Sequence, residues 1–249
     1  MFKTLRWPSV CQICHAWPST AVCTDCVTRF AQPVPRCPHC ALALPLALHA
    51  QTLHALALRD PSSHDQPLHV QMCAGCQATP SALDACHTAV SYGFPWDACM
   101  ARFKFRAEAG LARMLAHLMQ HAPQVEPTLE AAHWVLPMPL SRARMRERGF
   151  NQAHELAKQL APKKTQAHVL LRVGDGAHQV GASREVRQRL VQDAFWLAPQ
   201  ALAELKNKRV VLIDDVMTTG ATLYAAARVL RTAGVAHISG LVFARAEQH

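Results

Sequence analysis

The chain has 249 residues and half of them are apolar, which is enough for one α/β domain with its own core and a smaller module. Lysine and arginine total 26 against 17 aspartate and glutamate. The resulting net charge of +9 favours anionic partners such as phosphosugars, nucleotides or nucleic acid, although a basic chain alone is common. No signal peptide is visible and no stretch approaches the roughly 18 apolar residues of a membrane span, so we expect a cytoplasmic protein without a membrane segment and with reduced cysteines.

Eight of the ten cysteines form four C-x-x-C pairs in the first part of the chain. Two such pairs complete a tetrahedral thiolate site, and zinc fits it best, as a structural ion in up to two sites, because four thiolates leave no open position for catalysis. Iron–sulfur ligation and disulfides are less favoured alternatives. The simplest pairing is sequential, but a cross-braced pairing suits the spacing almost as well. The sequential sets are Cys11, Cys14, Cys23 and Cys26 for one zinc, and Cys37, Cys40, Cys73 and Cys76 for the other.

The segment between the third and fourth cysteine pairs is a long insert rich in histidine and proline. Within it we expect a helix over residues 42–58 and a polar loop over 60–67. Cys86 and Cys99 stand outside the paired pattern and are expected to be small core residues. We therefore expect a double zinc-ribbon module at residues 1–84 and an α/β domain at residues 85–249.

The second domain alternates predicted strands and helices. Strands are expected at 88–92, 133–136, 169–171, 210–213 and 237–243. Helices are expected at 95–105, 107–121 and 151–160, and a further one follows residue 222, with a loop at 123–127 and a mobile segment at 174–187. This alternation predicts a mainly parallel sheet with helices on both faces, and ligands then bind at the carboxyl ends of the strands.

The most informative run starts with four apolar residues, 210–213, which are typical of a buried strand. Asp214 and Asp215 follow where we expect that strand to end. A turn rich in hydroxyl groups then opens a helix, and its backbone N–H groups and helix dipole suit a phosphate, while the carboxylates suit a vicinal diol. An ordinary capped turn accounts poorly for two adjacent carboxylates. The turn residues are Thr218, Thr219, Gly220, Ala221 and Thr222.

These residues resemble the phosphoribosyl-pyrophosphate (PRPP) motif of type I phosphoribosyltransferases. The resemblance implies that Asp214 and Asp215 bind the ribose hydroxyls of PRPP. It also implies that residues 218–222 hold the 5′-phosphate. The expected fold is therefore that of a type I phosphoribosyltransferase, and the expected ligand is PRPP with Mg²⁺.

A dense basic run follows the strand expected at residues 133–136, and its density suits a pyrophosphate or a nucleic-acid backbone, with a solvated basic helix as the plainer interpretation. Its arginines are Arg142, Arg144, Arg146 and Arg148. Together with the cysteine pairs and the acidic motif, residues 148–152 (Arg-Gly-Phe-Asn-Gln) are similar to the ComF/GntX family of phosphoribosyltransferase-like proteins. Lys104 matches a lysine-bearing segment of that family, whereas Gln179, Ser183 and Arg187 match its mobile segment only in part.

The family resemblance implies a role in natural transformation, namely the handling of incoming single-stranded DNA in the cytoplasm. One hypothesis is a phosphoribosyltransferase in which Lys104 and Arg148 contact the departing pyrophosphate. A second is a non-catalytic module in which Arg142, Arg144 and Arg146 bind single-stranded DNA, with other DNA-uptake proteins as partners. A third, weaker hypothesis is a PRPP-responsive regulator of nucleotide salvage.

Overall fold

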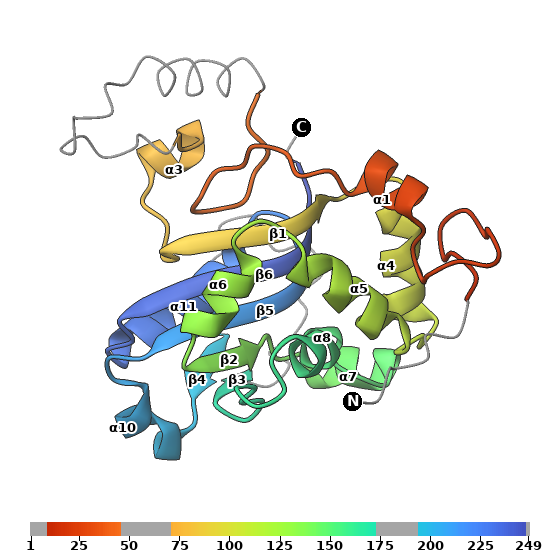
Figure 1. Cartoon of the computed structure of the whole chain (residues 1–249). Coiled ribbons are helices and arrows are strands. Elements are labelled where there is room, and N and C mark those ends of the chain that lie inside the picture. Colours follow the sequence, from red (N-terminus) through yellow and green to blue (C-terminus); the bar gives the residue numbers. More distant parts are fainter. Residues whose placement is uncertain (1–8, 46–70, 173–193, 248–249) are drawn as a thin grey trace, which may run out of the picture.

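A computed structural model of the chain describes residues 9–45, 71–172 and 194–247 (Figure 1). The polar loop expected at 60–67 and the mobile segment expected at 174–187 lie outside the described residues. So does most of the helix expected at 42–58. Its described part, residues 42–45, is not helical, because Ala43 forms an isolated β-bridge with Arg36 instead.

A parallel sheet forms the centre of the described part of the chain, with strand order β1-β6-β5-β2 (Figure 1). The strands are β1 (Ala85–Ser91), β2 (Trp134–Pro137), β5 (Arg209–Met217) and β6 (His237–Arg245). The two central strands are apolar and buried along most of their length, as expected when both faces of a parallel sheet are covered. The predicted α/β fold is confirmed, and the last predicted strand lies inside the sheet, between β1 and β5.

Helices cover both faces of this sheet (Figure 1). One face packs Val211, Ile213 and Phe243 against α4 (Trp96–Phe105), α5 (Leu111–Gln120) and α8 (Gln152–Leu160). The other face packs Leu212 and Val242 against α11 (Ala221–Thr232), whose apolar positions include Leu223, Ala226, Ala227 and Leu230. The sheet therefore separates two hydrophobic cores, one on each side.

Several elements differ from the expectations. Helix α5 begins four residues later than expected, after Ala107 adopts a left-handed backbone with φ 54°. The loop expected at 123–127 contains the start of α6 (Val125–Ala131), where Pro127 is tolerated because first-turn N–H groups have no partner within the helix. The strand expected at 169–171 is β3 (Leu170–Arg172), which pairs antiparallel with β4 (Phe195–Leu197) and stays apart from the main sheet. The short elements η1 (Pro199–Ala201) and α10 (Leu202–Leu205) follow.

The two cysteine segments pack against opposite cores. The first includes α1 (Thr24–Phe30) and contacts the core of α4 and α5, where Trp96 Nε1 donates a hydrogen bond to the Phe30 carbonyl at 2.7 Å. The second includes α3 (Ala74–Ala78) and adds Cys37 and Cys40 to the core that contains α11. The division of the chain at residue 84 stays a prediction.

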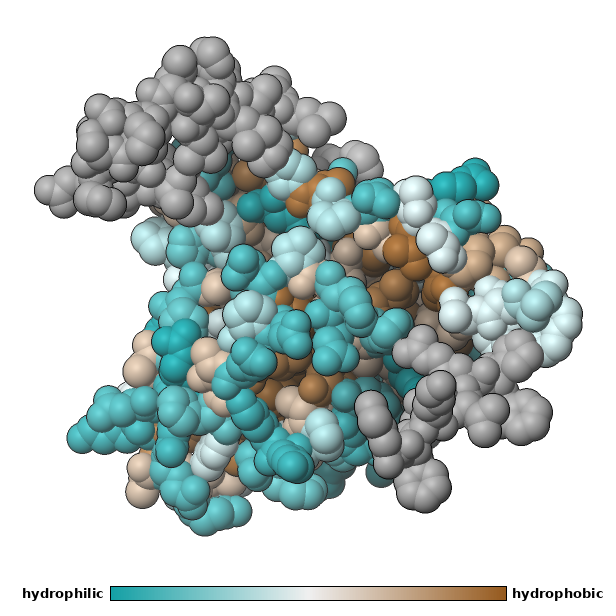
Figure 2. Space-filling model, in the orientation of Figure 1, coloured by the Kyte–Doolittle hydropathy of each residue, from teal (hydrophilic) through white to brown (hydrophobic). Residues whose placement is uncertain are grey.

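Polar side chains dominate the molecular face shown in Figure 2, and apolar side chains gather near α1 and α4. Across the described ranges, every helix is too short or too polar to cross a membrane.

Candidate functional site

The acidic pair lies within strand β5, near its carboxyl end. The expectation that Asp214 and Asp215 follow the end of the strand is wrong, since backbone pairing with β6 continues beyond them. Asp214 is opposite Val242, and Val216 is opposite Ala244. The rigid ladder therefore extends through the acidic pair and fixes the backbone from which both carboxylates project.

Asp215 is a buried carboxylate, 6% exposed, that meets two cations from distant segments. Lys104 Nζ lies 2.9 Å from its Oδ1, and Arg148 Nη1 lies 3.9 Å from its Oδ2. Lys104 comes from the last turn of α4, and Arg148 ends α7 (Arg142–Arg148), a helix that Ser141 caps. The structure thus brings together three residues singled out from separate parts of the sequence, and their charges compensate one another in a largely buried place.

Asp214 has a different environment from its neighbour. Its Oδ1 accepts a hydrogen bond from the backbone N–H of Asp215 at 2.8 Å. Burial and the adjacent Asp215 carboxylate raise the pKa of Asp214 from 3.8 to about 7. Near neutral pH the Asp214 carboxyl group is therefore only partly ionised and is able to exchange a proton.

The turn after β5 leads into the amino terminus of α11, a helix of 12 residues. Gly220 has φ 81°, and a Cβ atom there would lie 2.4 Å from the Met217 methyl carbon and 2.7 Å from the Tyr224 ring. A side chain at this position would force Met217 and Tyr224 to shift, and the positive φ would strain any residue other than glycine. Thr218 and Thr219 are exposed, while Ala221 and Thr222 are half-buried. This arrangement places exposed hydroxyl groups and the positive end of a helix dipole beside the acidic pair.

Gln152 is a site residue to which the sequence analysis assigned no role. It is 1% exposed, its Oε1 accepts from Arg148 Nη1 at 3.0 Å, and its Nε2 donates to the Phe103 carbonyl at 3.4 Å. It therefore connects Arg148 to the helix turn that carries Lys104. The sequence did offer a signal for Gln152. It is the first residue of a helix, directly after the capping residue Asn151, and it lies four residues after Arg148, within reach of that side chain.

The arginines of α7 divide into two groups. Arg148 is mostly buried, its Nε has no hydrogen-bond partner among the described residues, and its guanidinium lies 5.6 Å from the centre of the Phe105 ring. Arg142, Arg144 and Arg146 are exposed and do not join the cluster at Asp215. A single arginine of the basic run therefore belongs to the acidic site, and the other three face solvent.

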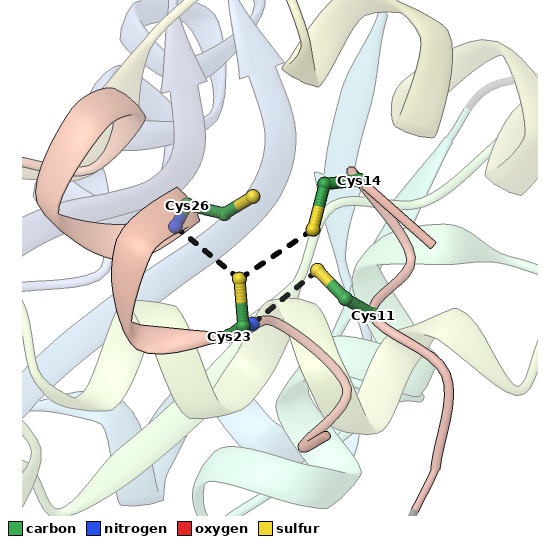
Figure 3. Close-up of side chains that lie close together, drawn as sticks. All are labelled: Cys11, Cys14, Cys23 and Cys26. Atoms are coloured by element: carbon green, nitrogen blue, oxygen red, sulfur yellow. Dashed lines mark hydrogen bonds between the residues drawn. The ribbon is translucent and has the colours of Figure 1, made fainter. Parts of the chain in front are cut away.

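The eight paired cysteines form two groups of four, each with all its Sγ atoms within 4.8 Å of one another. The members of the first group point toward a common centre (Figure 3). The groups follow the sequential pairing, not the cross-braced one. The Sγ atoms of Cys14 and Cys23 lie 3.6 Å apart, and those of Cys40 and Cys73 lie 3.5 Å apart.

Those separations fit a metal ion bound by four thiolates, because tetrahedral bonds of about 2.3 Å place sulfur atoms roughly 3.8 Å apart. Burial raises the pKa of Cys11, but the backbone N–H groups of Cys14, Cys23 and Ile13 outweigh it and lower that pKa to about 6, which favours the thiolate. Cys86 and Cys99 lie in the two cores, outside both groups, as expected.

A cavity of about 290 Å³ lies at the opposite end of the sheet, where the strands begin. Arg209, His237 and Thr128 are among its lining residues. None of the residues of the acidic site lines it, so its position does not mark that site. We base the candidate site on the convergence of Lys104, Arg148 and Asp215 instead.

Comparison with known proteins gives consistent matches. Residues 146–248 match the phosphoribosyl transferase domain, which includes Arg148, the acidic pair and the turn but leaves Lys104 outside. Competence protein F of Haemophilus influenzae is 32% identical over 186 residues, covering 72% of this chain and 80% of that protein. Competence protein ComFC of Bacillus subtilis is 36% identical over 138 residues, covering 55% of this chain and 54% of that protein. DNA utilization protein YhgH of Salmonella typhimurium is 25% identical over 243 residues, covering 94% of this chain and 96% of that protein.

Proposed function

The chain belongs to the ComF family of phosphoribosyltransferase-like proteins, and on this basis we propose that its acidic site binds PRPP, or a related phosphosugar or nucleotide, together with Mg²⁺. The observation that carries the proposal is the convergence of Lys104 and Arg148 on Asp215 beside the Thr/Gly turn. Cations for a pyrophosphate, carboxylates for a diol and a helix amino terminus for a phosphate are the three features that such a ligand requires.

Each group has a defined task in this proposal. The turn at residues 218–222 holds the 5′-phosphate, and Asp214 and Asp215 accept hydrogen bonds from the ribose hydroxyls. Lys104 and Arg148 hold the pyrophosphate, and Mg²⁺ supplies further positive charge as the pyrophosphate leaves. Positive charge that develops on the ribose during transfer is stabilised by the two carboxylates, which are already in place.

We place this activity in DNA uptake during natural transformation, in the cytoplasm. Relatives described as competence proteins and as DNA utilization proteins support the process. The free thiols of two cysteine groups support a reducing compartment. In this proposal each group holds one structural zinc ion, so the purified protein contains two zinc ions that treatment with a thiol-blocking reagent releases.

A second candidate function is the binding of single-stranded DNA, with or without transferase chemistry. Arg142, Arg144 and Arg146 supply exposed cations for a phosphate backbone. Exposed aromatic rings supply surfaces on which bases stack, and Phe94 is 78% exposed.

Calorimetric titration with Mg·PRPP tests the main proposal. We expect binding by the wild type and an affinity at least about tenfold lower for Asp214→Asn/Asp215→Asn, because charge-assisted hydrogen bonds to the diol are lost. Inorganic pyrophosphate lacks the diol, so the same variant should bind it at least as well as the wild type does, since Lys104 and Arg148 lose their intramolecular partner. Glu126→Gln/Glu130→Gln makes the same change in net charge on α6 and is the matched control. Failure of the wild type to bind Mg·PRPP would contradict the proposal.

Salt titration tests the DNA candidate. The triple variant of Arg142, Arg144 and Arg146 to Gln should weaken binding to an oligothymidylate and reduce its dependence on salt, while leaving Mg·PRPP affinity unchanged. A triple variant of exposed arginines elsewhere, at positions 106, 113 and 228, removes the same charge as a control. Equal losses in both triple variants would show that net charge, not the α7 surface, accounts for the binding.

A further inference from the structure

Arg245 is a buried cation at the end of β6, next to Met217 of β5, and it is 3% exposed. Its Nε donates to the Cys40 carbonyl at 2.8 Å. Its Nη1 donates to the Met217 carbonyl at 3.2 Å and also to the carbonyls of Thr218 and Ala246. One guanidinium therefore joins the second cysteine group to the first residue of the Thr/Gly turn.

The contacts with Met217 and Thr218 control the direction in which the turn presents its amides. In a trans peptide the carbonyl and the following N–H point in opposite directions. Because Arg245 holds the carbonyls of Met217 and Thr218, the N–H groups of Thr218 and Thr219 are aimed away from the buried guanidinium. This is the orientation that an anion-binding turn needs.

The contact with Cys40 connects the same guanidinium to a charged cluster. A divalent cation with four thiolates keeps a surplus of negative charge, so nearby cations stabilise it. Arg36 supports the same loop, since its Nη1 donates to the Ala41 carbonyl at 3.0 Å. Within the described ranges no carboxylate forms an ion pair with Arg245, and a buried cation without such a partner depends on other sources of negative potential.

The first cysteine group has different connections. Gln12 Oε1 accepts from Arg102 Nη2 at 2.9 Å, and the Phe30 carbonyl accepts from Trp96, so this group is tied to helix α4. Figure 1 shows the same separation, with the chain of residues 31–45 beside the end of β6 and the first cysteine loop beside α4.

We propose that Arg245 is a positioning residue that couples the Thr/Gly turn to the second cysteine group, so that metal in that group sets the shape of the turn. The proposal rests on the turn being the phosphate site of the proposed function. Metal in the first group has no such effect on the turn.

Hydrogen exchange in the full-length, zinc-loaded protein tests the coupling without any ligand. The amides of Tyr224 and Ala246 report on the turn, because they donate to the carbonyls of Gly220 and Met217. We expect Cys76→Ser, in the second group, to speed their exchange about tenfold, as expected for a lost charge-assisted hydrogen bond. Cys14→Ser, in the first group, is the matched control and should leave both amides unchanged, with zinc content falling by one ion in each variant.

Arg245→Lys tests the residue itself, because lysine keeps the charge but cannot span the carbonyls of both segments. We expect the exchange of Tyr224 and Ala246 to speed about tenfold, Mg·PRPP affinity to fall by a similar factor, and zinc content to stay at two. Unchanged exchange in Arg245→Lys would overturn the proposal. Equally faster exchange of the α5 amides in this variant would also overturn it, because that result would indicate general destabilisation. If the wild type fails to bind Mg·PRPP, the proposed function fails, while the exchange data still decide the coupling.

Discussion

The two cysteine groups are each built from two C-x-x-C pairs but occupy different positions in the fold. Cys14 in the first group is exposed, and the segment around it contacts helix α4, which carries Lys104. Cys37 and Cys40 in the second group are buried in the core beneath α11, and the adjacent backbone contacts Arg245. The comparison shows that two groups built from the same C-x-x-C pairs contact different elements of the fold. One supports the helix with the cation, and the other supports the strand ends and the turn.

The largest expected difference between the groups is in stability. Cys40→Ser should lower the free energy of unfolding by more than about 4 kcal/mol, because in the proposed function it removes a zinc ligand inside a hydrophobic core. Cys14→Ser changes an exposed cysteine of the first group and should cost clearly less. Urea unfolding of the two zinc-loaded variants measures the difference. Equal losses in the two variants would mean that both groups contribute equally to stability, which would contradict the difference expected from their positions.

The next effect concerns the cation that the first group supports. Lys104→Met leaves the buried Asp215 carboxylate with Arg148 alone, at 3.9 Å, and should lower the free energy of unfolding by about 3 kcal/mol. Arg106→Met, an exposed arginine directly after the same helix, is the control and should change stability little. Urea unfolding at pH 7 measures both. A negligible effect of Lys104→Met would show that the ion pair does not hold α4 against the sheet.

Asp214 lies between helix α4, which the first group contacts, and the turn near the second group. Its raised pKa predicts that the stability of the protein depends on pH. Its pKa is raised from 3.8 to about 7 by burial and by Asp215, so the folded chain holds this proton more tightly than the unfolded chain does. Stability should therefore fall as the pH rises through this range. Asp214→Asn keeps the amide-accepting oxygen without the charge. It should be similar in stability to the wild type near pH 4 and more stable at pH 8, with a difference that grows by about 1.4 kcal/mol per pH unit between the two pKa values.

Urea unfolding across this pH range measures the difference, with Glu126→Gln as a control for net charge. A constant difference between wild type and Asp214→Asn at every pH would contradict the raised pKa.

The smallest expected change in stability tests whether the first cysteine group acts on α4 alone and the second group acts on the turn. Gln12→Ala removes one partly buried hydrogen bond to Arg102 and should cost about 0.5–1 kcal/mol. It should leave the exchange of Tyr224 and Ala246 unchanged, because the first group does not contact the turn. Faster exchange at those two amides in Gln12→Ala would show that the groups are not independent.

Patterns within one segment could be predicted from the sequence. The buried strand with its acidic pair, the amphipathic helix α5 and the four C-x-x-C pairs each carry their signal within a few residues. The sequential grouping of the cysteines was one of two open alternatives. The sequence did not exclude the cross-braced arrangement, because spacing alone does not show which pairs fold onto which face of the sheet.

Features that depend on contacts between distant segments were not predictable in the same way. Lys104 and Arg148 could be identified as cations, but their meeting at Asp215 depends on how α4 and α7 pack. Strand β3 looked like a member of the main sheet, because its antiparallel partner β4 comes more than twenty residues later. Arg245 carried a usable signal, since it is the one charged residue among the last seven of β6, but its acceptors Cys40 and Met217 lie in two other segments.

The compensated charges at Asp215 have a consequence for selectivity in the proposed function. Lys104 and Arg148 already have a carboxylate partner, so a simple anion such as phosphate or chloride gains little by displacing it. A ligand that offers a diol to the carboxylate and a pyrophosphate to the cations replaces both halves of the ion pair in one event. The site then binds a molecule that carries both chemical groups more tightly than a molecule that carries only one of them.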